Sequence, residues 1–102
     1  MSDTKWTNGL WEIVERSDTW NIKAGNRCIA RLQMKDGVLY DAHLIVAAPG
    51  LYEELEISTD NIETLAIRLD KEPGNQIVVG AMMHRVRVNR AALARARGEE
   101  TK

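Results

Sequence analysis

The stretch that decides the fold is DAHLIVAAPGLYEELE, residues 41–56. It opens with an apolar run, meets Pro49 and Gly50, and continues as an acidic segment that carries leucines. The residue before a proline avoids the helical region, whereas proline itself is well tolerated in the first turn of a helix. We therefore expect a corner at Pro49 and Gly50, between a short buried helix over 38–48 and a long amphipathic helix over 50–71.

The second of these segments has the rhythm of a helical packing stripe, with spacings of 4, 3, 4, 3 and 4 residues. The stripe consists of Leu51, Leu55, Ser58, Ile62, Leu65 and Leu69. Its polar member, Ser58, also begins a pattern typical of a helix N-cap with a capping box, which Glu63 continues, so a break near residue 58 is an open alternative. Pro73 and Gly74 end the segment.

Upstream, residues 10–34 alternate between apolar and polar side chains, which indicates strands with one buried face. LWEIVE, WNIKA and RCIARLQM are the three runs, and the third places Cys28 on the inward face with its alternate neighbours. Gly25 lies between the second and third runs, where a tight hairpin needs a positive φ. Three strands with one apolar face need a cover, so we expect helices to pack on that face.

Downstream, residues 77–97 fit a third helix, because their apolar residues recur on one side and the AALARARG end favours a helix that closes at Gly98. A strand within 77–88 is the alternative, since this part is rich in β-branched residues. Together these patterns predict an α+β fold, with a three-stranded antiparallel meander over about 10–34 packed against two or three helices over about 38–48, 50–71 and 77–97.

Length and composition indicate one domain, residues 1–102, with flexible ends at about 1–5 and 98–102. The start of the chain is polar, and its apolar runs are far shorter than the roughly 20 residues that a membrane span needs. With a lone cysteine, we expect a protein of a reducing cytoplasm that has no membrane partner. The net charge of −1 argues against polyanion binding by bulk charge.

Candidate chemistry is sparse. Cys28, His43 and His84 lack the close paired spacing of zinc ligands, and the scattered glycines form no phosphate loop. An inward cysteine behaves as a small hydrophobe, and no base is evident beside a nucleophile. We therefore expect no catalytic residues, no metal ligands and no cofactor, and we expect that the protein is not an enzyme.

Two residue types are candidates for contact with a partner. Trp6 precedes the first strand, and tryptophan is enriched at binding hot spots. Arg87, Arg90 and Arg95 belong to a segment, residues 77–102, with a formal charge of +4, which could lie along phosphates. However, residues 51–72 carry −5 and offer an internal partner for this charge.

Residues 41–55 resemble a pattern of many small proteins of bacteriophages and prophages, roughly Asn-Ala-x-Leu-Ile-Ala-Ala-Ala-Pro-Glu-Leu-Leu-Glu-Ala-Leu. The positions that match are Ala42, Leu44, Ile45, Ala47, Ala48, Pro49, Leu51, Glu53 and Leu55. Those proteins often carry an Ile-Ala-Arg strand end, like 29–31 here, and a final helix that is similar to 90–99. Gly50 departs from the pattern, which has an acid after the proline. The resemblance brings no established activity or site residue with it.

The resemblance implies a phage accessory protein, and such proteins commonly act by occupying a target. We therefore expect a non-enzymatic binding protein that inhibits or sequesters a bacterial host or defence factor. The alternatives are nucleic-acid binding through the arginine helix and capture of a small anionic, nucleotide-like ligand. Because the apolar stripe exceeds what one small sheet can cover, we also expect a homodimer formed through Leu51, Leu55, Ile62, Leu65 and Leu69, called the leucine stripe below.

Overall fold

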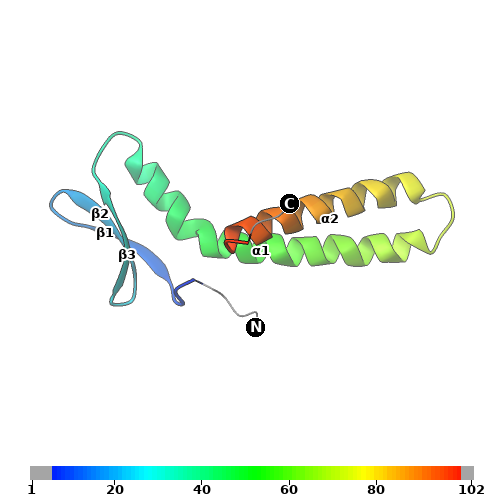
Figure 1. Cartoon of the computed structure of the whole chain (residues 1–102), viewed down its shortest axis with the longest axis horizontal. Helices are drawn as coiled ribbons and strands as arrows, with labels where there is room; N and C mark the ends of the chain where they lie inside the picture. The colour runs from blue at the N-terminus through cyan, green and yellow to red at the C-terminus, as the bar shows by residue number, and fades with distance from the viewer. Residues whose placement is uncertain (1–5, 100–102) are drawn as a thin grey trace. The chain divides into compact units, whose positions relative to one another are not determined.

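The computed structural model of the protein describes residues 6–99. It divides the chain into two compact units, Met1–Pro49 and Gly50–Lys102, called the sheet unit and the hairpin unit below (Figure 1). The tails that we expected to be flexible fall outside the described residues, except for 98 and 99. The prediction of a single domain stays a prediction.

The sheet unit contains the expected meander. Strands β1 (Trp11–Glu15), β2 (Thr19–Ala24) and β3 (Arg27–Gln33) form an antiparallel sheet in the order β1-β2-β3. The tight turn between β2 and β3 begins at Gly25, whose φ of +60° is a conformation that a side chain would strain. The predicted α+β class is thus confirmed.

A bulge in β3 changes one face of the sheet. Ile22 of β2 pairs with Ala30, but its neighbour Lys23 pairs with Cys28, so the register shifts by one residue. Because strand side chains alternate between faces, the shift places Cys28 on the opposite face from Ala30. The expectation of an inward Cys28 is therefore wrong, and the thiol is exposed.

The core of the sheet unit is small. Ile22 and Ala24 of β2 are buried on the apolar face of the sheet, and Ala42, in the helical segment that follows β3, has no exposed surface at all. Figure 1 shows this segment beside the sheet. We infer that the segment covers the apolar face, as three strands with one apolar face require.

Helix α1 (Val38–Asp70) runs through Pro49, so the expected corner at this residue is wrong, as are the separate helices over 38–48 and 50–71. A proline inside a helix removes one hydrogen bond, here the one that residue 49 would donate to the carbonyl of residue 45. Good helix formers on both sides continue the helix across that loss. Ser58 also lies inside α1, which excludes the alternative of a break there.

Helix α2 (Gln76–Ala96) confirms the helical reading of the last segment over the strand alternative. Its end is defined by Gly98, which has a φ of +82°, and by the N–H of Glu99, which donates to the carbonyl of Ala94 at 2.9 Å. This geometry satisfies carbonyls that the helix end leaves free. Residues 98 and 99 are therefore part of a helix cap, and the expected flexible end stays a prediction.

The hairpin unit pairs the later part of α1 with α2, and the two lie side by side in opposite directions (Figure 1). Their buried residues are Thr59 and Ala66 on α1 and Val86, Leu93 and Ala94 on α2. In the turn between the helices, the side-chain amide of Asn75 donates to the carbonyl of Leu69 at 3.1 Å. Among the described residues, neither helix combines the length and the apolar character that crossing a membrane requires.

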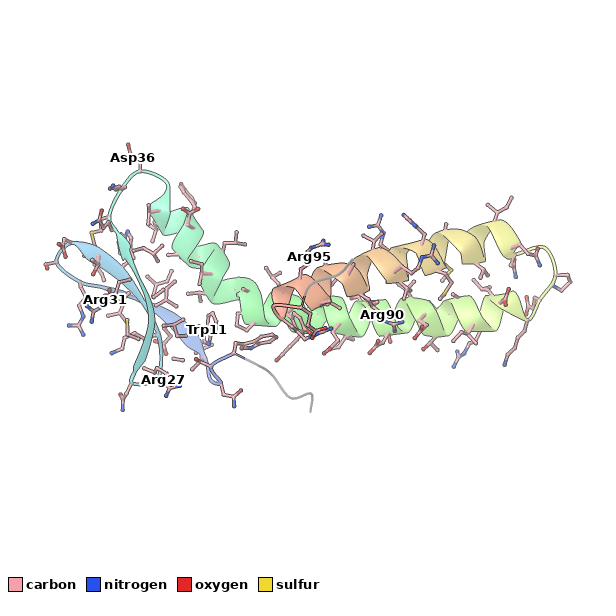
Figure 2. All side chains as sticks on the ribbon, viewed as in Figure 1. Trp11, Arg27, Arg31, Asp36, Arg90 and Arg95 are labelled. Carbon is pink, nitrogen blue, oxygen red and sulfur yellow. The ribbon has the colours of Figure 1, made fainter. Side chains whose placement is uncertain are left out.

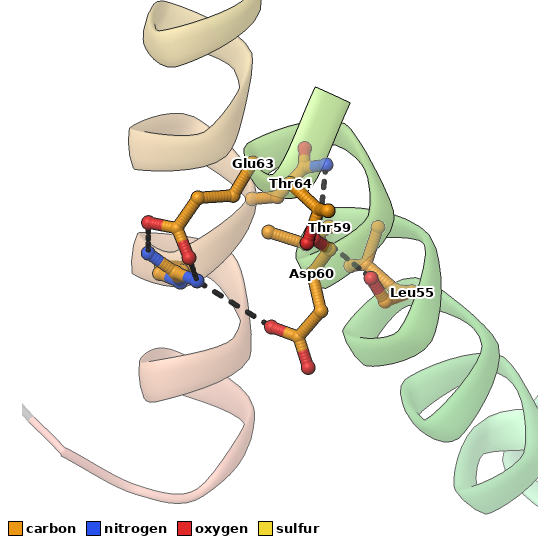
Figure 3. A network of polar contacts seen from close by, with 7 residues as sticks. Leu55, Thr59, Asp60, Glu63 and Thr64 are labelled. Carbon is orange, nitrogen blue, oxygen red and sulfur yellow. Dashed lines mark hydrogen bonds and ion pairs between the residues drawn. The ribbon is translucent and has the colours of Figure 1, made fainter. Parts of the chain in front are cut away.

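One polar contact lies in the middle of this helix pair. The hydroxyl of Thr59 donates to the carbonyl of Leu55 at 2.6 Å and accepts a hydrogen bond from the side-chain amide of Asn89 at 3.1 Å. Figure 3 shows this contact between the two helices. Thr59 is buried and Asn89 is half-buried, and a shift of either helix would leave the amide of Asn89 without this acceptor, so we infer that the pair helps to set the register of α2 along α1.

Candidate functional site

Arg90, one of the predicted contact residues, is already engaged within the hairpin unit. Its two terminal nitrogens each lie 2.8 Å from an oxygen of Glu63, and Nη2 also lies 3.4 Å from Oδ1 of Asp60 (Figure 3). A planar guanidinium that meets a carboxylate with two parallel bonds makes the strongest type of ion pair. Arg90 therefore links α2 to α1, as the opposite charges of the two segments suggested.

The pair also changes the acidity of both partners. The hydrogen bond from Arg90 holds the pKa of the Glu63 carboxyl below its ordinary value of 4.5, with the positive charge of Arg90 adding to the effect. The same bond raises the pKa of Arg90 further above its usual range, and Asp60 contributes less. Glu63 therefore remains ionised under mildly acidic conditions.

A second arginine ties down the end of α2. Nε of Arg97 lies 2.8 Å from Oε2 of Glu99, and Nη1 donates to the hydroxyl of Tyr52 on α1 at 2.6 Å. These two hydrogen bonds, first that to Glu99 and then that to Tyr52, raise the pKa of Arg97. Arg90 and Arg97 are seven residues apart and so lie on the same side of α2.

Between these two arginines lies a hollow of about 200 Å³ on the surface of the hairpin unit. It is lined by Glu56, Thr59, Asp60, Arg90, Leu93 and Arg97. Each guanidinium at its edge already meets a carboxylate, and two further carboxylates line the wall. An anionic ligand would have to displace these partners, so the charge of the hollow gives little support to a nucleotide-like ligand.

The other predicted contact residues do not join Arg90. Arg87 and Arg95 are exposed and have no ion-pair partner among residues 6–99. Figure 2 shows Arg95 pointing away from α1, whereas Arg90 lies on the side of α1. Trp6 is half-buried in the sheet unit. Trp6 thus belongs to the sheet unit, whereas the three arginines belong to the hairpin unit.

The leucine stripe lies only partly between the helices. Leu55, Ile62 and Leu69 are half-buried, whereas Leu51 and Leu65 are exposed. The residues of α1 that α2 buries are Thr59 and Ala66. These two small residues are seven positions apart and lie beside the leucine stripe on the surface of α1. Small side chains allow close approach of two helices, which explains why the contact is turned away from the leucines.

Sequence reasoning missed the apolar surface of the sheet unit. We expected residues 38–48 to be buried on all sides, but only Ala42 is buried there. Tyr40 is 79% exposed and Leu44 is 64% exposed. At about 100° per residue, Tyr40, Leu44 and Ala47 lie opposite Ala42 on the helix. These three residues are called the Tyr40 face below. Their i, i+4, i+7 spacing is visible in the sequence and is the signal from which a separate apolar face could have been predicted.

The residues considered for metal or nucleophilic chemistry are dispersed. Cys28, His43 and His84 are all exposed. Within the described part of the chain, no three His, Cys, Asp or Glu side chains gather closely enough to hold a metal ion. The ion pairs of the hairpin unit do bring charged groups together, and those of Arg90 link α2 to α1.

The ion pair makes a prediction about pH. A carboxyl whose pKa is lower in the folded state stabilises the fold above its unfolded pKa, and this contribution is lost as the pH falls through the folded value. We therefore expect the melting temperature of the hairpin unit to decrease below pH 4.5, partly through Glu63. Glu63→Gln should make this decrease shallower in melts followed by circular dichroism, whereas Glu54→Gln should not. If the melting temperatures of wild type and Glu63→Gln depended on pH in the same way, the ion pair of Glu63 would not contribute to stability as we expect.

Comparison with known proteins supplies one match. The family described as Salmonella phage P22 protein Y8K6 matches residues 1–100 of the chain. Neither the curated proteins nor the solved structures contain a match.

Proposed function

Because the chain belongs to the family of Salmonella phage P22 protein Y8K6, we propose that it is a non-enzymatic binding protein that the phage uses to inhibit or sequester a bacterial host or defence protein. Membership of the family supports the phage origin. The binding role is supported by one structural observation, the exposed Tyr40 face of the sheet unit.

The Tyr40 face has the properties of a helix that binds in a groove. Such helices present apolar side chains at i, i+4 and i+7, and Tyr40, Leu44 and Ala47 have this spacing. Tyrosine is enriched among the residues that dominate binding energies, and its hydroxyl can remain hydrated at the edge of a contact. The exposed polar residues Asp41 and His43 flank the face, as in the polar rim of an interface.

The inhibition that we propose is steric. The sheet covers the Ala42 side of the helical segment, so the Tyr40 face is held on a supported helix before the partner arrives. Preorganisation of this kind reduces the entropy that binding costs. A partner with an apolar groove would bury Tyr40 and Leu44, and the bound protein would block whatever normally occupies that groove.

The test compares three immobilised baits in a lysate of the bacterial host. Wild type and the control variant Asp41→Ala/His43→Ala should retain the same host protein, and Tyr40→Ala/Leu44→Glu should lose it. Loss of a hot spot costs at least about 2 kcal/mol, so with the purified host protein we expect Kd to rise by at least about 30-fold. A host protein that binds wild type and the Tyr40/Leu44 variant equally would overturn the use of this face.

Nucleic-acid binding remains the second candidate, because Arg87 and Arg95 are exposed. It is less well supported, since Arg90 is already held by Glu63. This function would make retention in the same experiment sensitive to nuclease and steeply dependent on salt. Arg87→Glu/Arg95→Glu would then abolish retention, which the Tyr40/Leu44 variant would leave unchanged.

A further inference from the structure

We infer that two copies of the chain associate through the exposed flank of the hairpin unit, with their α1 helices antiparallel and a twofold axis near Ser58. This inference concerns the assembly of the chain and does not depend on the proposed host target. It turns the expected homodimer into a specific arrangement, because the structure separates the residues that α2 buries from those that it leaves exposed.

The first argument is the small core of the hairpin unit. Among the described residues of this unit five are buried, and of these only Val86 and Leu93 are large and apolar, while the others are Thr59, Ala66 and Ala94. Two helices that bury so little gain little hydrophobic free energy against the entropy of ordering the chain. Units of this size usually depend on a further stabilising element such as oligomerisation.

The second argument is the location of the apolar surface that remains. Leu51, Ser58 and Leu65 recur every seven residues and fall within about 40° of one another on α1. Leu65 lies about 160° around the helix from Glu63, which pairs with Arg90. The hairpin unit therefore has one flank of ion pairs and an opposite flank with exposed leucines.

Helix α2 extends this apolar flank. At about 100° per residue, Val78, Met82 and Ala96 lie on the side of α2 away from Arg90. Val78 and Ala96 are exposed, and Met82 is half-buried. The flank is thus formed by both helices of the unit, although the exposed Arg85, about 20° around α2 from Val78, interrupts its apolar part. Four-helix bundles pack through flanks of two helices in this way.

The third argument selects a second copy as the occupant. Leu51 and Leu65 are each seven residues from Ser58, and Leu55 and Ile62 are three and four residues from it. A twofold axis at Ser58 would place Leu51 of one copy against Leu65 of the other, and Leu55 within one residue of Ile62. In such an interface each residue meets its partner twice, as twofold symmetry requires.

The length and the centre of the face also suit this arrangement. Residues 51–69 extend over about 27 Å of helix, which provides several layers of side chains for an antiparallel pair. The small side chain of Ser58 at the axis would allow the two helices to approach closely. Leu55 and Ile62, which α2 leaves half-buried, would lose their remaining exposure between the copies.

The test uses two matched substitutions on α1. Leu65 is 52% exposed and Ile67 is 54% exposed, but at two residues apart they face different flanks. In sedimentation velocity, wild type and Ile67→Glu should be dimers at micromolar concentration. Leu65→Glu should be a monomer with the helix content of wild type, its dimer Kd raised by at least about 100-fold, because symmetry places the new charge in the interface twice.

Cross-linking tests the position of the axis. In a Cys28→Ser background, Ser58→Cys should form a disulfide-linked dimer on mild oxidation, since the two residues at the axis meet. Leu65→Cys should not, because each Leu65 lies seven residues, about 10.5 Å, from the axis at Ser58. The two copies would therefore be roughly 21 Å apart along the antiparallel helices, which is out of reach of a disulfide. A monomeric wild type, equal effects of Leu65→Glu and Ile67→Glu, or a Leu65→Cys dimer without a Ser58→Cys dimer would each overturn the inference.

Discussion

Val86→Asp is expected to unfold the hairpin unit. Val86 is almost completely buried where α2 meets α1, with Leu93 and Ala94 as its buried neighbours along the helix. An aspartate there would bring a charge into this contact, and the cation one turn further along the helix, Arg90, is already held by Glu63, so we expect a cost of at least about 3 kcal/mol. Natural domains have only about 5–15 kcal/mol of stability in total, and a unit with so small a core lies at the low end.

The measurement is the helical signal in circular dichroism as the temperature rises. Val88→Asp is the matched control, because it makes the same change two residues along the same helix at a side chain that is 40% exposed. The control should shift the midpoint by a few degrees at most, whereas Val86→Asp should remove most of the helical signal before heating begins. Similar melting curves for the two variants would show that Val86 is not at the contact.

Ile22→Ala is expected to destabilise the sheet unit by about 2–5 kcal/mol. Ile22 is fully buried at the centre of β2, between Ile13 of β1 and Ala30 of β3. Its neighbours Ala24 and Ala42 are too small to fill the space that the isoleucine would leave. The cavity would therefore persist, and its cost would add to the lost transfer free energy of the side chain.

Tryptophan fluorescence in urea reports this change selectively, because Trp6, Trp11 and Trp20 all belong to the sheet unit. The control is Ile77→Ala, the same substitution at a side chain that is almost fully exposed in the first turn of α2. It should change the unfolding free energy by no more than about 0.5 kcal/mol. A midpoint for Ile22→Ala that equals that of the control would remove Ile22 from the core.

The features that the sequence predicted correctly are those that depend on residues close together in the chain. The meander could be predicted because alternation and a glycine turn are local properties, which the backbone expresses wherever the strands finally pack. Helix α2 could be predicted for the same reason, from its alanine-rich end and its closing Gly98. Pro49 misled the prediction because a local preference against helix was opposed by helix formers on both sides, and only the balance of the two decides the outcome.

The candidate surfaces were less predictable, because they depend on which side of a helix is covered. Alternation placed Cys28 inside, and a single bulge moved it to the opposite face. The leucine stripe was recognisable in the sequence, but α2 packs on the neighbouring line of Thr59 and Ala66 and leaves Leu51 and Leu65 exposed. The exposure of Tyr40 likewise depends on the packing of Ala42 below it.

By itself, the sequence determined the kinds of elements, their order and the opposite charges of the two helices, since propensity, periodicity and charge are properties of neighbouring residues. Only the tertiary structure decided that Arg90 is used to hold Glu63, that one flank of the hairpin unit is polar and the other apolar, and that Tyr40 faces outward. These outcomes are set by contacts between residues about 30 positions apart, and such contacts depend on small rotations of a helix that no local pattern specifies.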